Sequence, residues 1–156
     1  SVWDYPDFDA HEGVHLFTDP ASGLKAVIAV HSTALGPAAG GVRFWHYADD
    51  ALGVTDALRL SRGMSFKNAM AGLALGGGKG VILADKPGAV IPEAQLKAFG
   101  RAVQARPVGP GKLAIVELRH RGCIDCARHG ISVIKGLVHW RWRGGRSSAS
   151  AGTGLG

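Results

Sequence analysis

The run GGGKGVILA at residues 76–84 decides how the rest of the chain is interpreted. Four glycines surround Lys79, and the short apolar stretch 81–84 follows them directly. An apolar run of this length is typical of a strand buried in a sheet. Consecutive glycines let a ligand approach main-chain N–H groups with no Cβ in the way. We therefore expect a ligand-binding glycine loop at 76–80 that leads into a buried strand.

Strand signals and a second glycine loop precede this run. Residues 14–16 and 24–30 are strand-like, and the sequence DPASG at 19–23 between them supplies the residue types of a turn. This pattern predicts a hairpin. Another glycine-rich segment, GPAAGG at 36–41, comes next, and we expect it to be a loop as well.

Helix signals stand on both sides of the 76–84 run. Asp49 begins a helix that we expect to reach Gly63, with a shorter helix over 64–71 behind it. Pro92 is suited to the first position of a last helix, and Leu96, Phe99 and Val103 recur on one face of it. The order β-β-α-α-β-α predicts an α/β fold, with a mixed sheet and flanking helices.

Composition limits the function classes. A chain of 156 residues with 46% hydrophobic residues is enough for one core and excludes the usual two-domain enzyme. No apolar stretch approaches the roughly 18 to 20 residues of a membrane span, so we expect no membrane partner. Acidic residues at positions 4, 7 and 9 occupy the place where a secretory signal carries Lys or Arg. We therefore expect a cytoplasmic protein.

Charge divides the chain into two parts. Residues 1–105 hold 9 Lys and Arg against 10 Asp and Glu, a net charge of −1, whereas residues 106–156 hold 9 against 2, a net charge of +7; together they give the overall +6. We expect 1–105 to be a folded domain and 106–156 to be an atypical basic tail rich in Gly and Arg, disrupted in reading frame or disordered. A basic tail can bind acidic partners or nucleic acid, although we consider nucleic acid the weaker possibility.

Neither nucleotide-binding glycine motif fits residues 76–81. The P-loop pattern requires Gly at position 73 and Ser or Thr at position 80, where this chain has Leu73 and Gly80. The dinucleotide fingerprint requires a third glycine where Val81 stands, and its loop follows a strand instead of preceding one. We predict no cofactor-binding residue here.

Two lysines near the glycines can divide the work of a catalytic site. Lys67 lies twelve residues before Lys79. One ammonium group can hold a substrate carboxylate, while the other amine, its pKa lowered by its neighbour and by burial, can take a proton from water. Arg43, beside the first glycine segment, could also meet a carboxylate. His31 and His46 have no partner at a recognisable spacing.

Four segments together are far more specific than any single glycine motif. They closely resemble the amino-terminal domain of the Glu/Leu/Phe/Val dehydrogenases, and the leucine dehydrogenase branch most of all, over about residues 10–105. The segments are SGLKAVIA at 22–29, LGPAAGGVR at 35–43, DALRLSRGMSFKNA at 56–69 and GLALGGGK at 72–79.

The resemblance implies an enzyme that oxidatively deaminates an L-amino acid, of the leucine or branched-chain type, to its 2-oxo acid and ammonia with NAD. It implies that Lys67 binds the substrate α-carboxylate and that Lys79 is the catalytic lysine. It also implies that Gly40 and Gly41 line the substrate pocket, and that the chain forms a homo-oligomer.

The chain departs from the family beyond residue 105. The aspartate motif that the family has after the helix ending near Gln104 is missing, and the nearest candidates are Glu117 and Asp125. The carboxy-terminal domain that holds NAD is also missing. We therefore expect a truncated chain that is inactive alone. The alternative is a non-catalytic protein that binds an amino or oxo acid, or an acidic partner through its tail.

Two His and two Cys lie within residues 120–129 at spacings of three. These residue types are zinc ligands, but no long loop separates two ligand pairs as it does in structural zinc sites. We therefore predict no metal site.

Overall fold

A five-stranded mixed sheet is the centre of the structure, a computed structural model that describes residues 1–105, 113–119, 131–134 and 137–140. The strand order is β1-β2-β4-β3-β5, with β1 and β2 antiparallel to their neighbours and β3 parallel to both β4 and β5. The strands are β1 (Gly13–Asp19), β2 (Leu24–Ser32), β3 (Ala38–Trp45), β4 (Gly76–Leu83) and β5 (Leu113–Arg119). The remaining elements are η1 (Val2–Asp4), α1 (Asp50–Met70), α2 (Glu93–Ala105) and a two-stranded sheet of β6 (Ile131–Ile134) and β7 (Leu137–Trp140).

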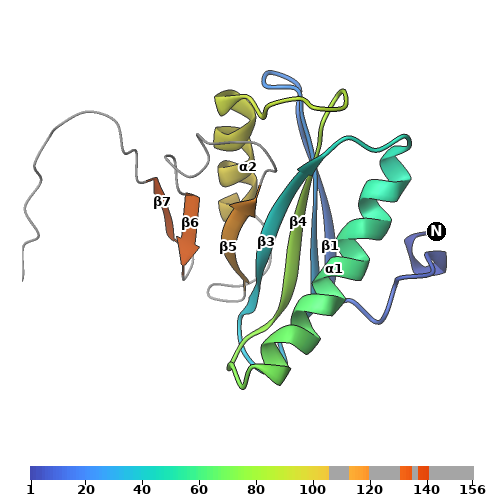
Figure 1. Ribbon diagram of the computed structural model, residues 1–156, viewed down its shortest axis with the longest axis vertical. Coiled ribbons are helices and arrows are strands. Elements are labelled where there is room, and N and C mark those ends of the chain that lie inside the picture. The colour runs from blue at the N-terminus through green and yellow to red at the C-terminus, as the bar shows by residue number, and fades with distance from the viewer. Residues whose placement is uncertain (106–112, 120–130, 135–136, 141–156) are drawn as a thin grey trace, which may run out of the picture.

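The two long helices cover opposite faces of the sheet (Figure 1). On the α1 face, Val27 of β2 and Val81 of β4 pack against Ala57 and Leu58 of the helix. On the α2 face, the alternate strand residue Ile28 packs in one cluster with Phe99. Successive residues of a strand point to opposite faces, so two apolar clusters form, one on each side. This confirms the predicted α/β class with a mixed sheet and flanking helices.

The hairpin of β1 and β2 forms as predicted. Its register runs from Gly13 opposite Val30 to Asp19 opposite Leu24. At the turn, the Ser22 hydroxyl donates to the Asp19 carboxylate over 2.6 Å, and Gly23 has a φ of 71°. Polar side chains that bond their own turn, followed by glycine in the left-handed region, are the reason that this sequence reverses the chain here.

The two glycine segments that we expected to be loops are largely strands, and this prediction was wrong. Residues 38–41 belong to β3, and residues 76–80 are the first part of β4. The two helices expected over 49–71 are a single helix, α1, because Gly63 does not interrupt it. The order of strands and long helices over residues 1–105 is therefore β-β-β-α-β-α. The last helix is confirmed, and it begins directly after Pro92.

Strand β5 lies beyond residue 105 and still joins the main sheet, as the parallel neighbour of β3. The domain boundary at 105 stays a prediction. The two His and two Cys at 120–129, where we predict no metal site, lie outside the described residues. Among the described residues, no helix is both long and apolar enough to cross a bilayer.

Candidate functional site

The α1 face of β4 carries Lys79. Its neighbours on that face of the strand are Gly77 and Val81, and both contact α1: Val81 packs with Leu58, and a Cβ on Gly77 would stand 2.1 Å from the Ser65 hydroxyl. Because side chains alternate along a strand, Lys79 points to the same side. It is half-buried and lies opposite Ala29 of β2.

Gly40 and Gly41 lie on β3, the strand on the other side of β4. The parallel register pairs Ala39 with Gly77 and Val42 with Gly80, which sets Gly41 beside Lys79. A Cβ on Gly40 would stand 1.7 Å from the Gly78 carbonyl oxygen, so only glycine lets these two strands approach so closely. Gly41 is half-buried, and the β3 register to β5 shifts between Gly40 and Gly41.

Lys67 lies in the last turn of α1, and its side chain is exposed. Its neighbours join this turn to the strands. The Asn68 amide donates to the Gly76 carbonyl over 2.6 Å, and the Met64 Cγ would be 3.4 Å from a Cβ on Gly40. A cation in the last turn also interacts favourably with the helix dipole, so this position suits a lysine whatever else it does.

The structure therefore brings the four predicted site residues to one side of the sheet. Gly40, Gly41 and Lys79 lie on adjacent strands, and Lys67 lies in the last turn of α1, the helix that crosses them. Two amines on the side of the sheet where glycines leave the strand backbone uncovered can divide two tasks. One can bind a carboxylate, and the other can act as an acid or base at a nearby carbonyl group. The role of each residue stays a prediction. Glu117, one of the two substitutes considered for the missing aspartate, pairs with Gly41 in the β5 register.

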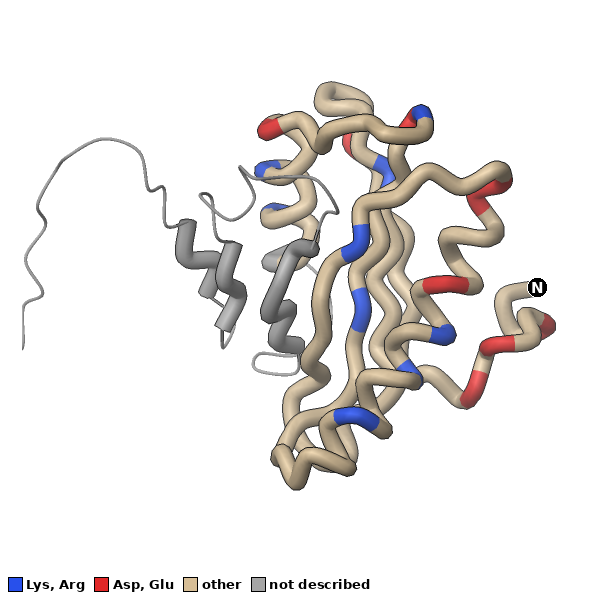
Figure 2. Tube along the Cα trace, in the orientation of Figure 1, with Lys and Arg blue, Asp and Glu red and all other residues tan. Residues whose placement is uncertain are grey.

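Basic and acidic residues are separated along α1, as Figure 2 shows. Asp49, Asp50 and Asp56 come first, and Arg59, Arg62 and Lys67 follow. Asp49 caps the helix by accepting from the Ala51 N–H over 2.9 Å. This order complements the helix dipole. It places the basic residues, Lys67 among them, in the second half of α1.

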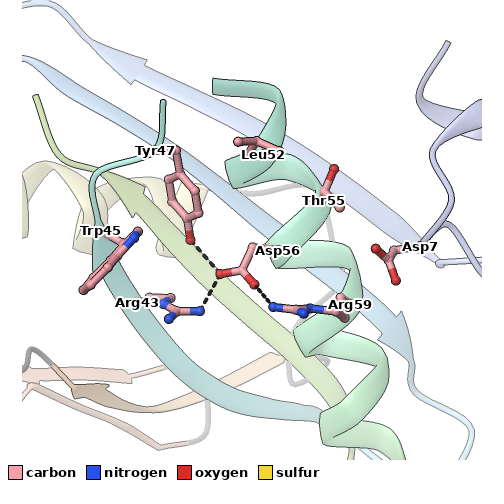
Figure 3. Close-up of a pocket in the computed structure, with 8 residues that line it drawn as sticks. All are labelled: Asp7, Arg43, Trp45, Tyr47, Leu52, Thr55, Asp56 and Arg59. Atoms are coloured by element: carbon pink, nitrogen blue, oxygen red, sulfur yellow. Dashed lines mark hydrogen bonds and ion pairs between the residues drawn. The ribbon is translucent and has the colours of Figure 1, made fainter. Parts of the chain in front are cut away.

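An open hollow of about 310 Å³ lies at the other end of α1 (Figure 3). Asp56 is its centre, with only 7% of its side chain exposed. It accepts from the Tyr47 hydroxyl and Arg43 over 2.6 Å each, and from Arg59 over 2.7 Å. The lining residues are Asp7, Arg43, Trp45, Tyr47, Leu52, Thr55, Asp56 and Arg59. They include none of the four predicted site residues.

Electrostatics explain this network. Burial alone would raise the pKa of Asp56, but the Tyr47 hydrogen bond and the two guanidinium groups outweigh burial and hold the pKa below its usual value. Burial and the Asp56 hydrogen bond raise the pKa of Tyr47. The carboxylate that Arg43 meets is thus an internal one, and the network ties α1 to β3.

Sequence reasoning missed a second polar cluster, in which the amino-terminal segment is bound to α1. Buried His11 accepts from the Asp9 N–H at Nδ1 over 3.1 Å, so its neutral ring carries the proton at Nε2 and donates to the Leu58 carbonyl over 3.0 Å. His31 does have partners: its Nδ1 is 2.7 Å from the Ser65 hydroxyl, and its Nε2 is 3.5 Å from the Asp9 carboxylate. His46 bonds the Ala84 carbonyl. No spacing in the sequence could have indicated contacts this remote.

Within the ranges that the structure describes, no group of three or more His, Cys, Asp or Glu could hold a metal ion.

Comparisons with known proteins show which family this chain is similar to. Residues 11–112 match the family described as Glu/Leu/Phe/Val dehydrogenase, dimerisation domain. A valine dehydrogenase from Streptomyces albus is 47% identical over 150 residues, which are 96% of this chain and 38% of that protein. A leucine dehydrogenase from Thermoactinomyces intermedius is 50% identical over 103 residues, 66% of this chain and 28% of that protein. The crystal structure of the L-tryptophan dehydrogenase from Nostoc punctiforme has a TM-score of 0.61 and 38% identity, over 69% of this chain and 30% of that one.

The chain spans little more than a third of the length of the Streptomyces relative. Because that match covers 150 of the 156 residues, it extends past residue 105 into the basic segment.

Proposed function

This chain belongs to the Glu/Leu/Phe/Val dehydrogenase family, and on that basis we propose that it is the substrate-binding part of an NAD-dependent amino-acid dehydrogenase. The reaction converts an L-amino acid, oxidised NAD and water into a 2-oxo acid, an ammonium ion, reduced NAD and a proton. Its relatives include valine, leucine and tryptophan dehydrogenases, so we propose an apolar, branched-chain substrate, a cytoplasmic location and a homo-oligomeric state.

The cofactor of this reaction, NAD, would supply the acceptor for a hydride. The glycines at 76–80 do not fit its pyrophosphate, because they lie inside β4 and not between a strand and the start of a helix. We therefore expect this chain alone not to reduce NAD.

The observation that carries the proposal is that Lys67 in the last turn of α1 and Lys79 on β4 lie on the same side of the sheet. We propose that the exposed Lys67 ammonium binds the substrate carboxylate. The half-buried Lys79 would act at the α-carbon, taking a proton from the attacking water and stabilising the negative charge that develops on its oxygen. The backbone of Gly40 and Gly41 would line the pocket beside Lys79.

Binding of a 2-oxo acid tests this proposal without a cofactor. Calorimetry with 4-methyl-2-oxopentanoate should show binding to the parent chain and a loss of affinity of at least about tenfold in Lys67→Ala, since a charge-assisted hydrogen bond contributes about 1.5–3 kcal/mol. Lys97→Ala is the matched control: Lys97 is exposed on α2, on the other face of the sheet, where it pairs with Glu93. Equal affinity of the parent and Lys67→Ala would overturn the assignment of Lys67.

A further inference from the structure

Asn68 follows Lys67 in the last turn of α1 and is almost completely buried, with 5% of the residue exposed. Its Nδ2 donates to the carbonyl of Gly76, the first residue of β4, over 2.6 Å, and lies 3.5 Å from the carbonyl of Ala39 in β3. One amide group therefore connects three elements. These are the helix turn of Lys67, the strand of Lys79 and the strand of Gly40.

A second contact joins the same part of α1 to β4. Ser65 packs directly on the backbone of Gly77, since a Cβ at that glycine would be 2.1 Å from the Ser65 hydroxyl and 2.4 Å from its backbone nitrogen. Lys67 lies between Ser65 and Asn68 in sequence, and its own side chain is exposed. The place of its amine therefore depends on how this turn is fixed to the strands.

We propose that Asn68 is a positioning residue for the substrate site. By binding the Gly76 carbonyl, it sets where the Lys67 amine stands relative to Lys79 and to the backbone of Gly40 and Gly41. The inference rests on the proposed function, because the position of the Lys67 amine relative to Lys79 matters only if both act on the same substrate. Helix ends are the first part of a helix to open, and a site that clamps a small substrate loses affinity when a group moves by about 1 Å.

The removal of this amide should weaken ligand binding more than its effect on stability explains. At a temperature well below the unfolding midpoint, Asn68→Ala should bind 4-methyl-2-oxopentanoate about tenfold more weakly than the parent chain, the factor that corresponds to one lost hydrogen bond of about 1.4 kcal/mol. Circular dichroism should show that the variant remains folded.

Ser61→Ala provides the matched control. Ser61 is also completely buried in α1 and also donates to a backbone carbonyl, that of Leu58, over 2.8 Å, but it lies two helical turns before Asn68. We expect this variant to lose comparable stability and to keep its affinity for the ligand within about twofold of the parent. A purely structural role for Asn68 predicts the same behaviour for both variants.

Asn68→Asp separates the hydrogen bond from the shape of the side chain. Its carboxylate is nearly isosteric with the amide but has no donor for the Gly76 carbonyl at pH 8. Protonation restores one O–H donor, and burial among carbonyl oxygens favours protonation at mildly acidic pH. The affinity of this variant relative to the parent should therefore recover between pH 8 and pH 5.

The outcomes distinguish the two proposals. If the parent chain and Lys67→Ala bind alike, or neither binds, the proposed function fails and the inference fails with it. If the parent binds, Lys67→Ala does not, and Asn68→Ala binds as well as the parent or only as weakly as Ser61→Ala, then Asn68 is not a positioning residue and the proposed function stands.

Discussion

Asp56 joins α1 to Arg43 of β3 and to Tyr47 just after that strand, and it also bonds Arg59 of α1 itself. Replacing it with Asn removes the charge and leaves two arginines without their common partner. We expect Asp56→Asn to lower the free energy of unfolding by about 2 kcal/mol, because buried hydrogen bonds to charged groups contribute about 1.5–3 kcal/mol. Urea unfolding followed by circular dichroism measures this loss.

Asp50→Asn is the control for that prediction. Asp50 pairs with Lys25 over 3.1 Å, but both side chains are mostly exposed, and such a pair contributes under about 1 kcal/mol. Equal losses in the two variants would contradict the importance assigned to burial at Asp56.

His11 should make stability depend on pH between neutral and mildly acidic conditions. Burial lowers its pKa below the ordinary 6.5, and the neighbouring His31 and Arg62 act in the same direction. In the unfolded chain the imidazole binds a proton near pH 6.5, whereas the folded chain resists protonation. The contribution is therefore fully present above pH 6.5 and is lost as the pH falls from 6.5 towards the pKa of the folded state.

The urea midpoint of the parent chain should thus decrease from pH 7.5 to pH 5.5, and His11→Gln should show a smaller decrease. His46→Gln, which changes a histidine bonded to the Ala84 carbonyl and outside this cluster, should keep the dependence of the parent. The same dependence in parent and His11→Gln would show that another group causes it.

At the scale of residues, the sequence indicated which side chains to consider better than it indicated their partners. Lys67 and Lys79 were selected from their neighbours in the chain, and the fold sets both on one side of the sheet. The Asp56 network and the contact of His11 with Leu58 could not be predicted. Apart from Arg59, which is three residues from Asp56, the partners are 9 to 47 residues apart. Only the packing of α1 on the sheet brings these distant partners together.

At the scale of elements, the close approach of α1 to β4 depends on Gly77. An added Cβ would stand 2.1 Å from the Ser65 hydroxyl and 2.3 Å from the Ser61 backbone oxygen, and the helix backbone cannot yield at low cost. We expect Gly77→Ala to destabilise the fold by about 1–3 kcal/mol, the usual cost of overpacking. Thermal or urea unfolding measures it.

Gly63→Ala should have the opposite effect. This glycine lies inside α1 with no atom within 4 Å of an added Cβ, and alanine in a helix interior is more favourable than glycine by about 0.5–1 kcal/mol. If both substitutions destabilise the fold equally, α1 and β4 are not packed as closely as described.

The errors in the predicted elements have the same physical origin. Glycine is a poor strand former, so residues 76–80 resembled a loop. The reason for glycine there is a neighbouring backbone or helix that no local pattern contains. Gly63 resembled a helix end for a similar reason, although a single glycine costs a helix of 21 residues only about 1 kcal/mol. The hairpin and α2 were predicted correctly because turn residues and apolar spacing are local signals.

At the scale of the whole molecule, three large apolar side chains remain exposed at the end of α1 and just after it. They are Phe66, Met70 and Leu73, and Met70 is 89% exposed. Phe66 and Met70 are four residues apart and therefore adjacent on the helix surface. Exposed apolar groups that gather in this way are typical of surfaces that another protein surface covers.

We therefore expect the chain to self-associate through this end of α1. The double variant Phe66→Gln/Met70→Gln should shift sedimentation velocity towards the monomer and change the free energy of unfolding by less than about 0.5 kcal/mol, because neither side chain contributes to the core. Leu16→Gln is the control: Leu16 is 70% exposed on the edge strand β1 and is a single apolar side chain. Association that persists in the double variant and disappears with Leu16→Gln would place the contact on the β1 edge of the sheet, where a second copy could add its own strand.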